Sequence, residues 1–524
     1  MYAKMLSASV VGVEGRLIEV EVNLSSGLPQ VAIVGLPDPA VRESVERVRA
    51  AIQNGGMTFP LDRITVNLAP ADMRKEGSAY DLAIAAGILS ASGQLPKERL
   101  DGVLLIGELS LSGEVRPVPG VLPMVERARR EGLRRVIVPR ACVAEARLIE
   151  GIEVLGIASL GEWKQDPRDA GPVGNACSDA PESGGEPAAT EAFANDVDLA
   201  DVVGQTHGKR ALLIAAAGKH NLLVVGPPGT GKTMLCRRLP TLLPPLDDEE
   251  ALAVTKIYSV CGKLGGRQGL IRRRPFRSPH HSISVAGLIG GGTVPKPGEV
   301  TLAHHGVLFL DELPEFTRGA LEALRQPLED RRVTIGRARG STAFPADFLL
   351  AVSLNPCPCG YWGFDGDRVC TCSAAAVARY RSRLSGPLVD RIDLQVEMPR
   401  QSGRGAPSGE WTSAWARERV AEAIERQKAR YRNSGIRWNS ELQGRKLAEF
   451  ARLAPDAEKL LAGIYDRLGL SHRAHDRILK MSRTIADLAA SERIEAEHVA
   501  EAVRYRCLDK PASDPPGFTS QNGK

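Results

Sequence analysis

The sequence predicts an α/β protein in which two α/β domains precede a helical C-terminal domain. A glycine-rich loop, Gly226–Thr233, lies between the short apolar run Leu222–Val225 and a segment that can form a helix. Short apolar runs alternate with helical segments from about residue 197 to 400, as in a parallel sheet covered by helices. After about residue 410 the apolar residues follow a helical period. These three observations define the predicted order of domains.

Residues 1–163 are predicted to form a mixed α/β domain. Apolar and polar residues alternate in Ile18–Leu24, which indicates a half-buried strand. Asp38 and Pro39 are a typical N-cap and first-turn pair, so a helix is expected to begin there. Further strands are expected at 31–34, 64–68 and 103–106.

The rest of the chain divides by composition and periodicity. Residues 164–196 are rich in Gly, Pro, Ala, Ser and acidic residues, which is typical of a flexible linker. Residues 197–400 are the predicted nucleotide-binding core, and residues 401–510 are the helical domain. Its strongest helical pattern is Arg473–Ala490, and Ser491 is the expected cap of the next helix. The tail, 511–524, is expected to be disordered.

Bulk composition narrows the class of protein. The 524 residues are 43% hydrophobic and 25% charged, which is ordinary for a globular protein. A net charge of +5 indicates no general preference for nucleic acid. No apolar run has the length of a membrane span, and Met1–Met5 lacks the apolar region of a signal peptide. We therefore expect a cytoplasmic protein without a membrane partner.

The loop fits G-x-x-x-x-G-K-[ST], the phosphate-binding P-loop. Its glycines let backbone N–H groups point at phosphate oxygens, and the next helix adds the positive end of its dipole. Lys232 is expected to reach the β- and γ-phosphates, and the Thr233 hydroxyl to bind Mg²⁺. ATP and Mg²⁺ are the predicted cofactors, with a glycine-rich turn that matches by accident as the alternative. The loop residues are Gly226, Pro227, Pro228, Gly229, Thr230, Gly231, Lys232 and Thr233.

Two other predicted strands end in polar residues that suit the same site. Val307–Leu310 is followed by Asp311, expected to hold Mg²⁺, and Glu312, expected to polarise the attacking water as general base. Phe348–Leu354 is followed by Asn355, whose side chain could bond the γ-phosphate or that water. The alternatives are a strand ending in two solvated acids and an asparagine that starts a turn.

Positive charge is also needed against the charge that develops in phosphoryl transfer, and arginine supplies it in planar form. Arg391 and Arg473 are the candidates. Either could equally be a surface arginine, and their proposed roles depend on the resemblance described below.

Cysteine usage indicates a metal site. Four of the nine cysteines form the pattern C-x-C…C-x-C, namely Cys357, Cys359, Cys370 and Cys372. Four thiolates suit tetrahedral Zn²⁺, so zinc is expected here. Free thiols, an iron–sulfur site and a redox pair are the alternatives. The pairs His280–His281 and His304–His305 are expected to be structural, because no third ligand has a clear spacing.

Together these features resemble the ComM/YifB family of magnesium-chelatase-like AAA+ ATPases, which are competence-related bacterial proteins. The resemblance covers nearly the whole chain except the linker and the tail. Further segments that carry it are Asp201–Gln205, Lys209–Ala211, Arg274–His281, Gly290–Gly292, Pro297–Glu299, Asn355–Gly360, Ser385–Leu388 and Arg483–Leu488.

The resemblance implies an AAA+ parallel α/β core with a C-terminal helical lid, assembled as a homo-hexameric ring with ATP between subunits. Asn355 would be the first sensor, Arg391 the arginine finger acting on the neighbour's nucleotide, and Arg473 the second sensor in its own subunit. It also implies a helicase-like motor that drives branch migration of DNA during recombination of incoming strands.

The N-terminal domain resembles the Lon-protease-like (S5-like) α/β fold. Lys75–Tyr80 aligns with the segment that carries the catalytic serine, and the nucleophile position falls on Ala79, with Ser78 one place early. Gly113–Val118 aligns with the later segment, and the catalytic lysine position falls on Met124. A Ser–Lys dyad needs both groups within hydrogen-bond reach, so a non-proteolytic assembly or DNA-binding module is expected.

Basic residues supply candidate DNA contacts. The segment 331–340 is basic, and its residues alternate as in a strand, which indicates a hairpin. In ring motors of this branch such a hairpin faces the central channel. Arg337 and Arg339 are therefore expected to contact DNA phosphates without reading sequence. The group Arg272, Arg273, Arg274 and Arg277 could do the same. A solvated surface, or pairing with a neighbouring subunit's carboxylates, is the alternative.

The leading functional hypothesis is an ATP-driven DNA motor acting on single-stranded or branched DNA. A metal-chelatase ATPase subunit and a protein-remodelling ATPase are the alternatives. An ATP-dependent protease is disfavoured by Ala79 and Met124. A scaffold that uses ATP only for assembly is disfavoured by the intact Lys232, Asp311 and Glu312. DNA-stimulated hydrolysis would separate these hypotheses.

Overall fold

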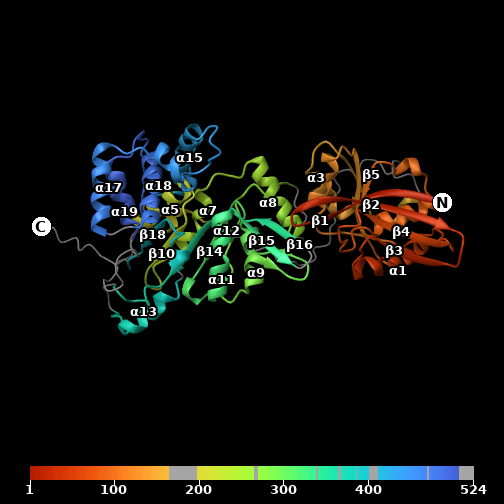
Figure 1. The fold of residues 1–524 in the computed structure, drawn as a ribbon, viewed down its shortest axis with the longest axis horizontal. Coiled ribbons are helices and arrows are strands. Elements are labelled where there is room, and N and C mark those ends of the chain that lie inside the picture. The colour runs from red at the N-terminus through yellow and green to blue at the C-terminus, as the bar shows by residue number, and fades with distance from the viewer. Residues whose placement is uncertain are drawn as a thin grey trace. The chain divides into compact units, whose positions relative to one another are not determined.

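The computed structural model describes residues 1–164, 197–264, 269–337, 340–363, 368–384, 386–400, 411–468 and 471–506 (Figure 1). Its contacts group into two compact units, the first holding the described residues of 1–164 with those of 248–271, and the second the remaining described residues. The predicted linker beyond Lys164 and the predicted tail lie outside the described residues.

The first unit is built on a mixed seven-stranded sheet in the order β3-β4-β2-β1-β5-β8-β9. Four pairings, β3–β4, β1–β5, β5–β8 and β8–β9, are parallel, and β2 runs antiparallel to both β1 and β4. This confirms the predicted mixed α/β domain. The strands are β1 (Tyr2–Val11), β2 (Glu14–Ser25), β3 (Gln30–Val34), β4 (Arg63–Ala69), β5 (Val103–Leu105), β8 (Arg135–Pro139) and β9 (Glu153–Ile157), beside a small ladder of β6 (Glu108–Leu109) and β7 (Val115–Arg116).

The helices of this unit begin where local signals place them. In α1 (Pro39–Asn54) the Asp38 carboxylate accepts from the Val41 N–H at 2.8 Å, which confirms the predicted N-cap. The apolar side of α1 is buried through Val41, Val48 and Ile52. The other helices are α2 (Asp81–Ala91), whose every residue is buried, α3 (Val121–Arg130) and α4 (Val143–Ala146).

One helix joins the first unit from within the predicted nucleotide-binding core. In α8 (Asp248–Val260) the Lys256 ammonium lies 2.8 Å from Glu14 and 2.7 Å from Glu126. The Gly120 N–H donates to the Ser259 carbonyl at 3.0 Å. The contacts therefore place this segment with the first unit, whereas the sequence placed it within the predicted core of residues 197–400. A helical period does not show which of two domains a helix packs against.

The second unit contains a five-stranded, wholly parallel sheet in the order β11-β14-β17-β10-β18. The residues of β10, β14 and β17 are all buried, as expected for a parallel sheet covered on both faces. The carboxyl ends of these three strands carry the predicted site residues. The strands are β10 (Leu222–Val225), β11 (Phe276–Arg277), β14 (Val307–Leu310), β17 (Leu349–Leu354) and β18 (Leu394–Glu397).

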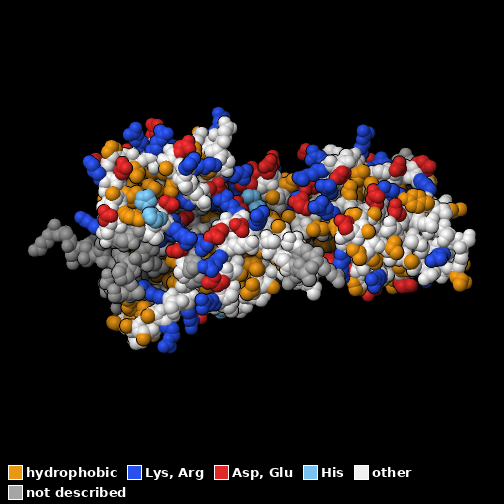
Figure 2. All heavy atoms as spheres, in the orientation of Figure 1, with side chains coloured by type: hydrophobic (Ala, Val, Ile, Leu, Met, Phe, Trp, Pro, Cys, Tyr) orange, Lys and Arg blue, Asp and Glu red, His pale blue; other side chains and the backbone are white. Residues whose placement is uncertain are grey.

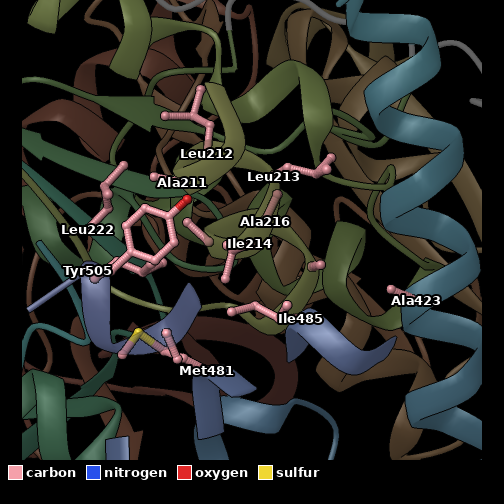
Figure 3. Packing of buried hydrophobic residues seen from close by; sticks show 14 of the residues in the cluster. Ala211, Leu212, Leu213, Ile214, Ala216, Leu222, Ala423, Met481, Ile485 and Tyr505 are labelled. Atoms are coloured by element: carbon pink, nitrogen blue, oxygen red, sulfur yellow. The ribbon is translucent and has the colours of Figure 1, made fainter. Parts of the chain in front are cut away.

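The predicted helical region follows β18, and its long helices lie together in Figure 1. Figure 3 shows part of the core to which α5 (Thr206–Gly218), α15 (Ser413–Arg430) and α18 (His472–Leu488) contribute Ala216, Ala423 and Ile485. The remaining helices of this region are α16 (Gly444–Phe450), α17 (Pro455–Leu468) and α19 (Ala496–Arg504). Within the described residues no helix is long and apolar enough to cross a membrane.

The predicted cap at Ser491 is wrong. The helix α19 is capped by Glu495, whose backbone N–H donates to His498 Nδ1 at 3.0 Å in a reciprocal capping box. The Ser491 hydroxyl instead donates to the Arg493 carbonyl at 2.7 Å. The bridge between Leu453 and Ile494 keeps the chain extended just before the helix, which delays its start.

Smaller elements connect the strands of this sheet. The predicted basic hairpin is present as β15 (Arg332–Arg337) paired with β16 (Gly340–Pro345). A second short hairpin joins β12 (Gly290–Gly291) to β13 (Lys296–Pro297). The helices here are α6 (Lys232–Arg237), α7 (Leu239–Leu242), α9 (Val285–Ile289), α10 (Glu299–Leu302), α11 (Arg318–Ala323), α12 (Arg325–Asp330), α13 (Ala374–Ser382) and α14 (Gly386–Val389).

Candidate nucleotide-binding site

The glycine-rich loop connects β10 to α6, as the sequence predicted. Gly229 and Gly231 have φ of 80° and 86°, a left-handed conformation that glycine adopts without steric cost. Gly226 is required for a different reason, since a Cβ built on it would lie 2.5 Å from the Met398 carbonyl oxygen. Its N–H donates to the Leu354 carbonyl of β17 at 3.3 Å, which ties the loop to the neighbouring strand.

The Lys232 ammonium is held by oxygen acceptors. Its Nζ donates to the carbonyls of Gly226 at 2.7 Å and Pro227 at 2.9 Å, and to Asn355 Oδ1 at 3.1 Å. Only 9% of Lys232 is exposed, and burial lowers the pKa of its amine, against the opposing effect of nearby carboxylates. The structure thus brings the P-loop lysine and the predicted sensor asparagine into direct contact, and phosphate oxygens could replace these acceptors.

A pair of oxygen ligands suited to Mg²⁺ lies beside this lysine. The Thr233 hydroxyl donates to Asp311 Oδ2 at 2.7 Å. Hydroxyl and carboxylate oxygens are the ligands that Mg²⁺ takes in nucleotide sites, so these two residues fit the ion. The Ser353 hydroxyl donates to the other oxygen, Asp311 Oδ1, and fixes the carboxylate from the side of β17.

Ser353 is a site residue that the sequence reasoning missed. It is fully buried and is the polar member of the otherwise apolar strand β17. Because β14 and β17 pair in parallel, with Leu310 opposite Val352, the residue after each lies at the same level of the sheet. A polar residue near the end of an apolar strand is the sequence signal that could have identified Ser353 as a site residue.

Glu312 is presented differently from Asp311. Its φ of 55° and ψ of 51° are left-handed, which costs a residue with a side chain about 1 to 2 kcal/mol. Its N–H donates to the Ser353 hydroxyl at 3.3 Å, and its side chain is exposed. Strained backbone of this kind concentrates at functional sites, and here it turns the carboxylate out of the sheet edge.

Each of the two predicted arginines makes an ion pair with a residue outside the P-loop. Arg391, 17% exposed, pairs with Glu329 of α12. Arg473, 70% exposed, lies 3.7 Å from Asp390. Since Asp390 directly precedes Arg391, the ion pair of Arg473 lies beside Arg391 in the chain.

The four predicted cysteine ligands converge. The Cys357 sulfur lies 3.3 Å from that of Cys359 and 3.8 Å from that of Cys370, and all four sulfurs lie within 4.8 Å of one another. A tetrahedral zinc–thiolate site with Zn–S of about 2.3 Å has sulfurs about 3.8 Å apart, so the cluster fits such an ion. The Trp362 N–H donates to the Cys357 sulfur at 3.3 Å, an outer-shell bond of the kind that orients metal ligands.

His304 and His280, one member of each histidine pair, make hydrogen bonds of the structural kind expected. His304 Nδ1 accepts from the Asp347 N–H at 3.0 Å, and His305 Nδ1 lies 3.6 Å from the Asp347 carboxylate. Burial lowers the pKa of His304 to about 3 and that of His305 to about 4, so both rings are neutral at neutral pH. His280 bonds the Ser282 hydroxyl at 2.8 Å.

Family models match the chain in succession. The model described as "Subunit ChlI of Mg-chelatase" matches residues 20–142. "Magnesium chelatase, subunit ChlI" matches 198–405, and "Magnesium chelatase, subunit ChlI C-terminal" matches 410–506.

Full-length relatives agree with these models. The chain is 46% identical to an uncharacterized protein of Mycobacterium tuberculosis, with 96% of this chain and 98% of that protein covered. It is 42% identical to YifB of Escherichia coli, with 96% of each covered. It is 43% identical to competence protein ComM of Haemophilus influenzae, with 97% of each covered. This chain belongs to the ComM/YifB family of magnesium-chelatase-like AAA+ ATPases. Membership of this family implies ATP and Mg²⁺ as cofactors.

The first unit of this ComM/YifB-family chain has a Lon-like region. Lon protease 2 of Bacillus subtilis is 29% identical over 165 residues, which cover 28% of this chain and 29% of that protein. Ala79 and Met124 are 8% and 3% exposed and belong to one apolar cluster. The Ser78 hydroxyl donates to Glu108, and the buried Lys75 amine donates to the Pro70 carbonyl. No hydrogen bond joins a serine to a lysine at this place in the described unit.

The basic residues predicted to contact DNA lie in different surroundings. Arg337 ends β15, and Arg339 lies outside the described residues. Arg274 donates to the Pro244 and His305 carbonyls at 2.7 and 2.8 Å, and Arg277 pairs with Glu299 at 2.6 Å. These last two arginines therefore stabilise the fold. Figure 2 shows Lys and Arg side chains interspersed with Asp and Glu over the visible face.

Proposed function

We propose that this protein is an ATP-driven DNA motor that promotes branch migration in homologous recombination and natural transformation. One observation carries the catalytic part. Beyond the carboxyl ends of β10, β14 and β17, Lys232 donates a hydrogen bond to Asn355 and Thr233 donates one to Asp311. The name of the H. influenzae relative, a competence protein, supports the DNA part. The reaction would take place in the cytoplasm.

In the proposed reaction the loop Gly226–Thr233 binds the triphosphate through its backbone N–H groups and Lys232. Thr233 and Asp311 hold Mg²⁺, whose chemistry is to neutralise charge on the β- and γ-phosphate oxygens. Glu312 accepts the proton of the attacking water, and Asn355 orients that water or the γ-phosphate. The exposed carboxylate of Glu312 and its left-handed backbone support this division of roles between the two acids.

We propose a homo-hexameric ring in which Arg391 is the arginine finger for the neighbouring subunit's nucleotide. Its guanidinium pairs with Glu329, an exposed carboxylate of α12, and the phosphates of a neighbour's nucleotide could replace this partner. Arg473 is the proposed second sensor. Its guanidinium is 70% exposed and lies 3.7 Å from the Asp390 carboxylate, so the phosphates of its own subunit's nucleotide could compete for it.

The proposed metal of the cysteine cluster is Zn²⁺, on the basis of four convergent thiols. The proposed DNA contacts are Arg337, the last residue of β15, and Arg339, which lies outside the described residues, both binding phosphates without sequence preference. The Lon-like unit is proposed to be a non-proteolytic assembly or DNA-binding module, because Ala79 and Met124 occupy the dyad positions.

A second candidate is a chelatase-type ATPase subunit or another protein-remodelling ATPase, which the descriptions of the three matching family models favour. Steady-state ATP hydrolysis with and without single-stranded and four-way-junction DNA separates the two, with Glu312→Gln as the blank. Stimulation by DNA supports the motor. Hydrolysis indifferent to DNA refutes it and favours a protein partner.

A further inference from the structure

The cysteine cluster touches the P-loop. Gly360 follows Cys359 and has a φ of 87°, and a Cβ built on it would lie 2.6 Å from Pro228 Cδ and 3.2 Å from Pro228 Cγ. Real side chains do not approach so closely, so the backbone of the cluster lies directly against the phosphate-binding loop. The Gly360 N–H donates to the Cys357 carbonyl at 3.0 Å, which links this contact to the first cysteine.

The cluster is also joined to the P-loop through β17. Asn355 lies two residues before the fully buried Cys357, and its amide oxygen accepts from Lys232 Nζ at 3.1 Å. The Gly226 N–H donates to the Leu354 carbonyl at 3.3 Å, one residue earlier. Both ends of the P-loop are thus bonded to the last residue of β17 and to the residue that follows it, on the path into the cluster.

The chain that leaves the cluster returns to the same site. Ser373, directly after Cys372, caps α13 by accepting from the Ala376 N–H at 3.2 Å. Tyr380 of α13 is 8% exposed, and burial together with the carboxylates of Glu315 and Glu312 raises the pKa of its hydroxyl to about 12. The Arg381 guanidinium lies 4.3 Å from the ring centroid of Trp362 in the cluster loop.

We propose that the metal-loaded cysteine cluster positions the P-loop for nucleotide, by seating Gly360 against Pro228 and Asn355 against Lys232. Loss of the metal then weakens ATP binding, and bound ATP slows loss of the metal, because coupling between two sites is reciprocal. This inference rests on two parts of the proposed function, zinc at the cysteines and ATP at the P-loop, and is independent of DNA.

The steric contact gives a test that leaves all four thiols in place. Gly360→Ala places a methyl group against Pro228, and we expect the Kd for a fluorescent ATP analogue to rise at least ~5-fold with unchanged zinc content. Gly435→Ala is the matched control, since Gly435 has a φ of 73° and nothing within 4 Å of a built Cβ. It carries the same backbone cost without the contact, and its Kd should remain that of the wild type.

A double variant separates the contact from general damage. Pro228→Ala removes the ring atoms that the new methyl group would meet, so Pro228→Ala/Gly360→Ala should bind the analogue more tightly than Gly360→Ala alone. A double variant no better than Gly360→Ala would overturn the contact as the cause.

The reciprocal effect is measured on the wild-type chain. With Mg²⁺ in excess, the rate of zinc transfer to a chromogenic chelator should fall several-fold when ATPγS is present, and should not change in Lys232→Ala. A release rate indifferent to nucleotide, or wild-type affinity in Gly360→Ala, overturns the proposal. Protein purified without any zinc also overturns it but leaves the ATPase assignment intact. Hydrolysis indifferent to DNA refutes the motor and leaves this inference standing.

Discussion

His220 joins Asp393 to Thr484 through the two nitrogens of one buried imidazole. Its Nδ1 lies 3.1 Å from Asp393 Oδ2, and its Nε2 lies 2.7 Å from the Thr484 hydroxyl. His220 and Asp393 precede the adjacent strands β10 and β18, whereas Thr484 belongs to α18. The His220 side chain thus ties the central sheet to the helical lid. Its partner Asp393 lies two residues after Arg391.

We expect His220→Ala to lower the free energy of unfolding by about 3 kcal/mol, because Asp393 and the Thr484 hydroxyl would lose a buried partner. Urea unfolding followed by circular dichroism measures the change. His207→Ala is the control, since His207 is exposed on α5. Equal stability of the two variants would show that the His220 bridge contributes nothing.

Glu312→Gln should leave the Kd for ATP within about two-fold of the wild type and lower kcat by about 10²- to 10⁴-fold, because the amide cannot accept the proton of water. Single-turnover hydrolysis and nucleotide binding are the two measurements. Glu315→Gln is the matched control, being an exposed neighbouring carboxylate that pairs with Arg383. Normal turnover by Glu312→Gln would refute the assignment of the base.

Arg391→Ala should be inactive alone but recover some hydrolysis when mixed with Glu312→Gln. The reason is that finger and base would meet across a subunit interface, where a wild-type pair can form in mixed rings. Hydrolysis is measured over a range of mixing ratios at constant total protein. If no ratio exceeds the sum of the separate activities, a finger acting on the neighbour is excluded.

Ser353→Ala should weaken Mg²⁺ activation of hydrolysis by about 10-fold, because the hydroxyl that orients Asp311 Oδ1 is lost. The Mg²⁺ concentration at half-maximal activity measures this effect. Ser482→Ala is the control, a buried serine of α18 that donates to the Ile478 carbonyl. The same Mg²⁺ dependence in both variants would argue against an orienting role.

Stability should fall with acidification from about pH 6.5, the ordinary histidine pKa, towards pH 4. Folding lowers the pKa of His304 to about 3 and of His305 to about 4, so in this window the unfolded chain binds more protons. At pH 5 each of these two histidines lowers the free energy of unfolding by about 2 kcal/mol relative to pH 7. His304→Gln/His305→Gln should flatten the unfolding free energy between pH 4 and 6.5, whereas His280→Gln/His281→Gln should not.

The local sequence pattern was sufficient to predict many helices and strands and much of the nucleotide site. The strand Leu222–Val225, the glycines after it and the helix from Lys232 are specified by neighbouring residues, so the P-loop was predictable at its exact positions. Asp311 and Asn355 were predictable because the carboxyl ends of parallel strands meet at one edge.

The tertiary structure alone decided which distant segments meet. Hydrophobic period shows which side of an element is buried but not against what, so α8 could not be assigned to the first unit from its sequence. The bond from Ser353 to Asp311, the pairing of Arg473 with Asp390 and the contact of Gly360 with Pro228 join segments that lie 42 to 132 residues apart in the sequence. Such contacts depend on strand order and loop path, which are fixed by the packing of the whole sheet and lid.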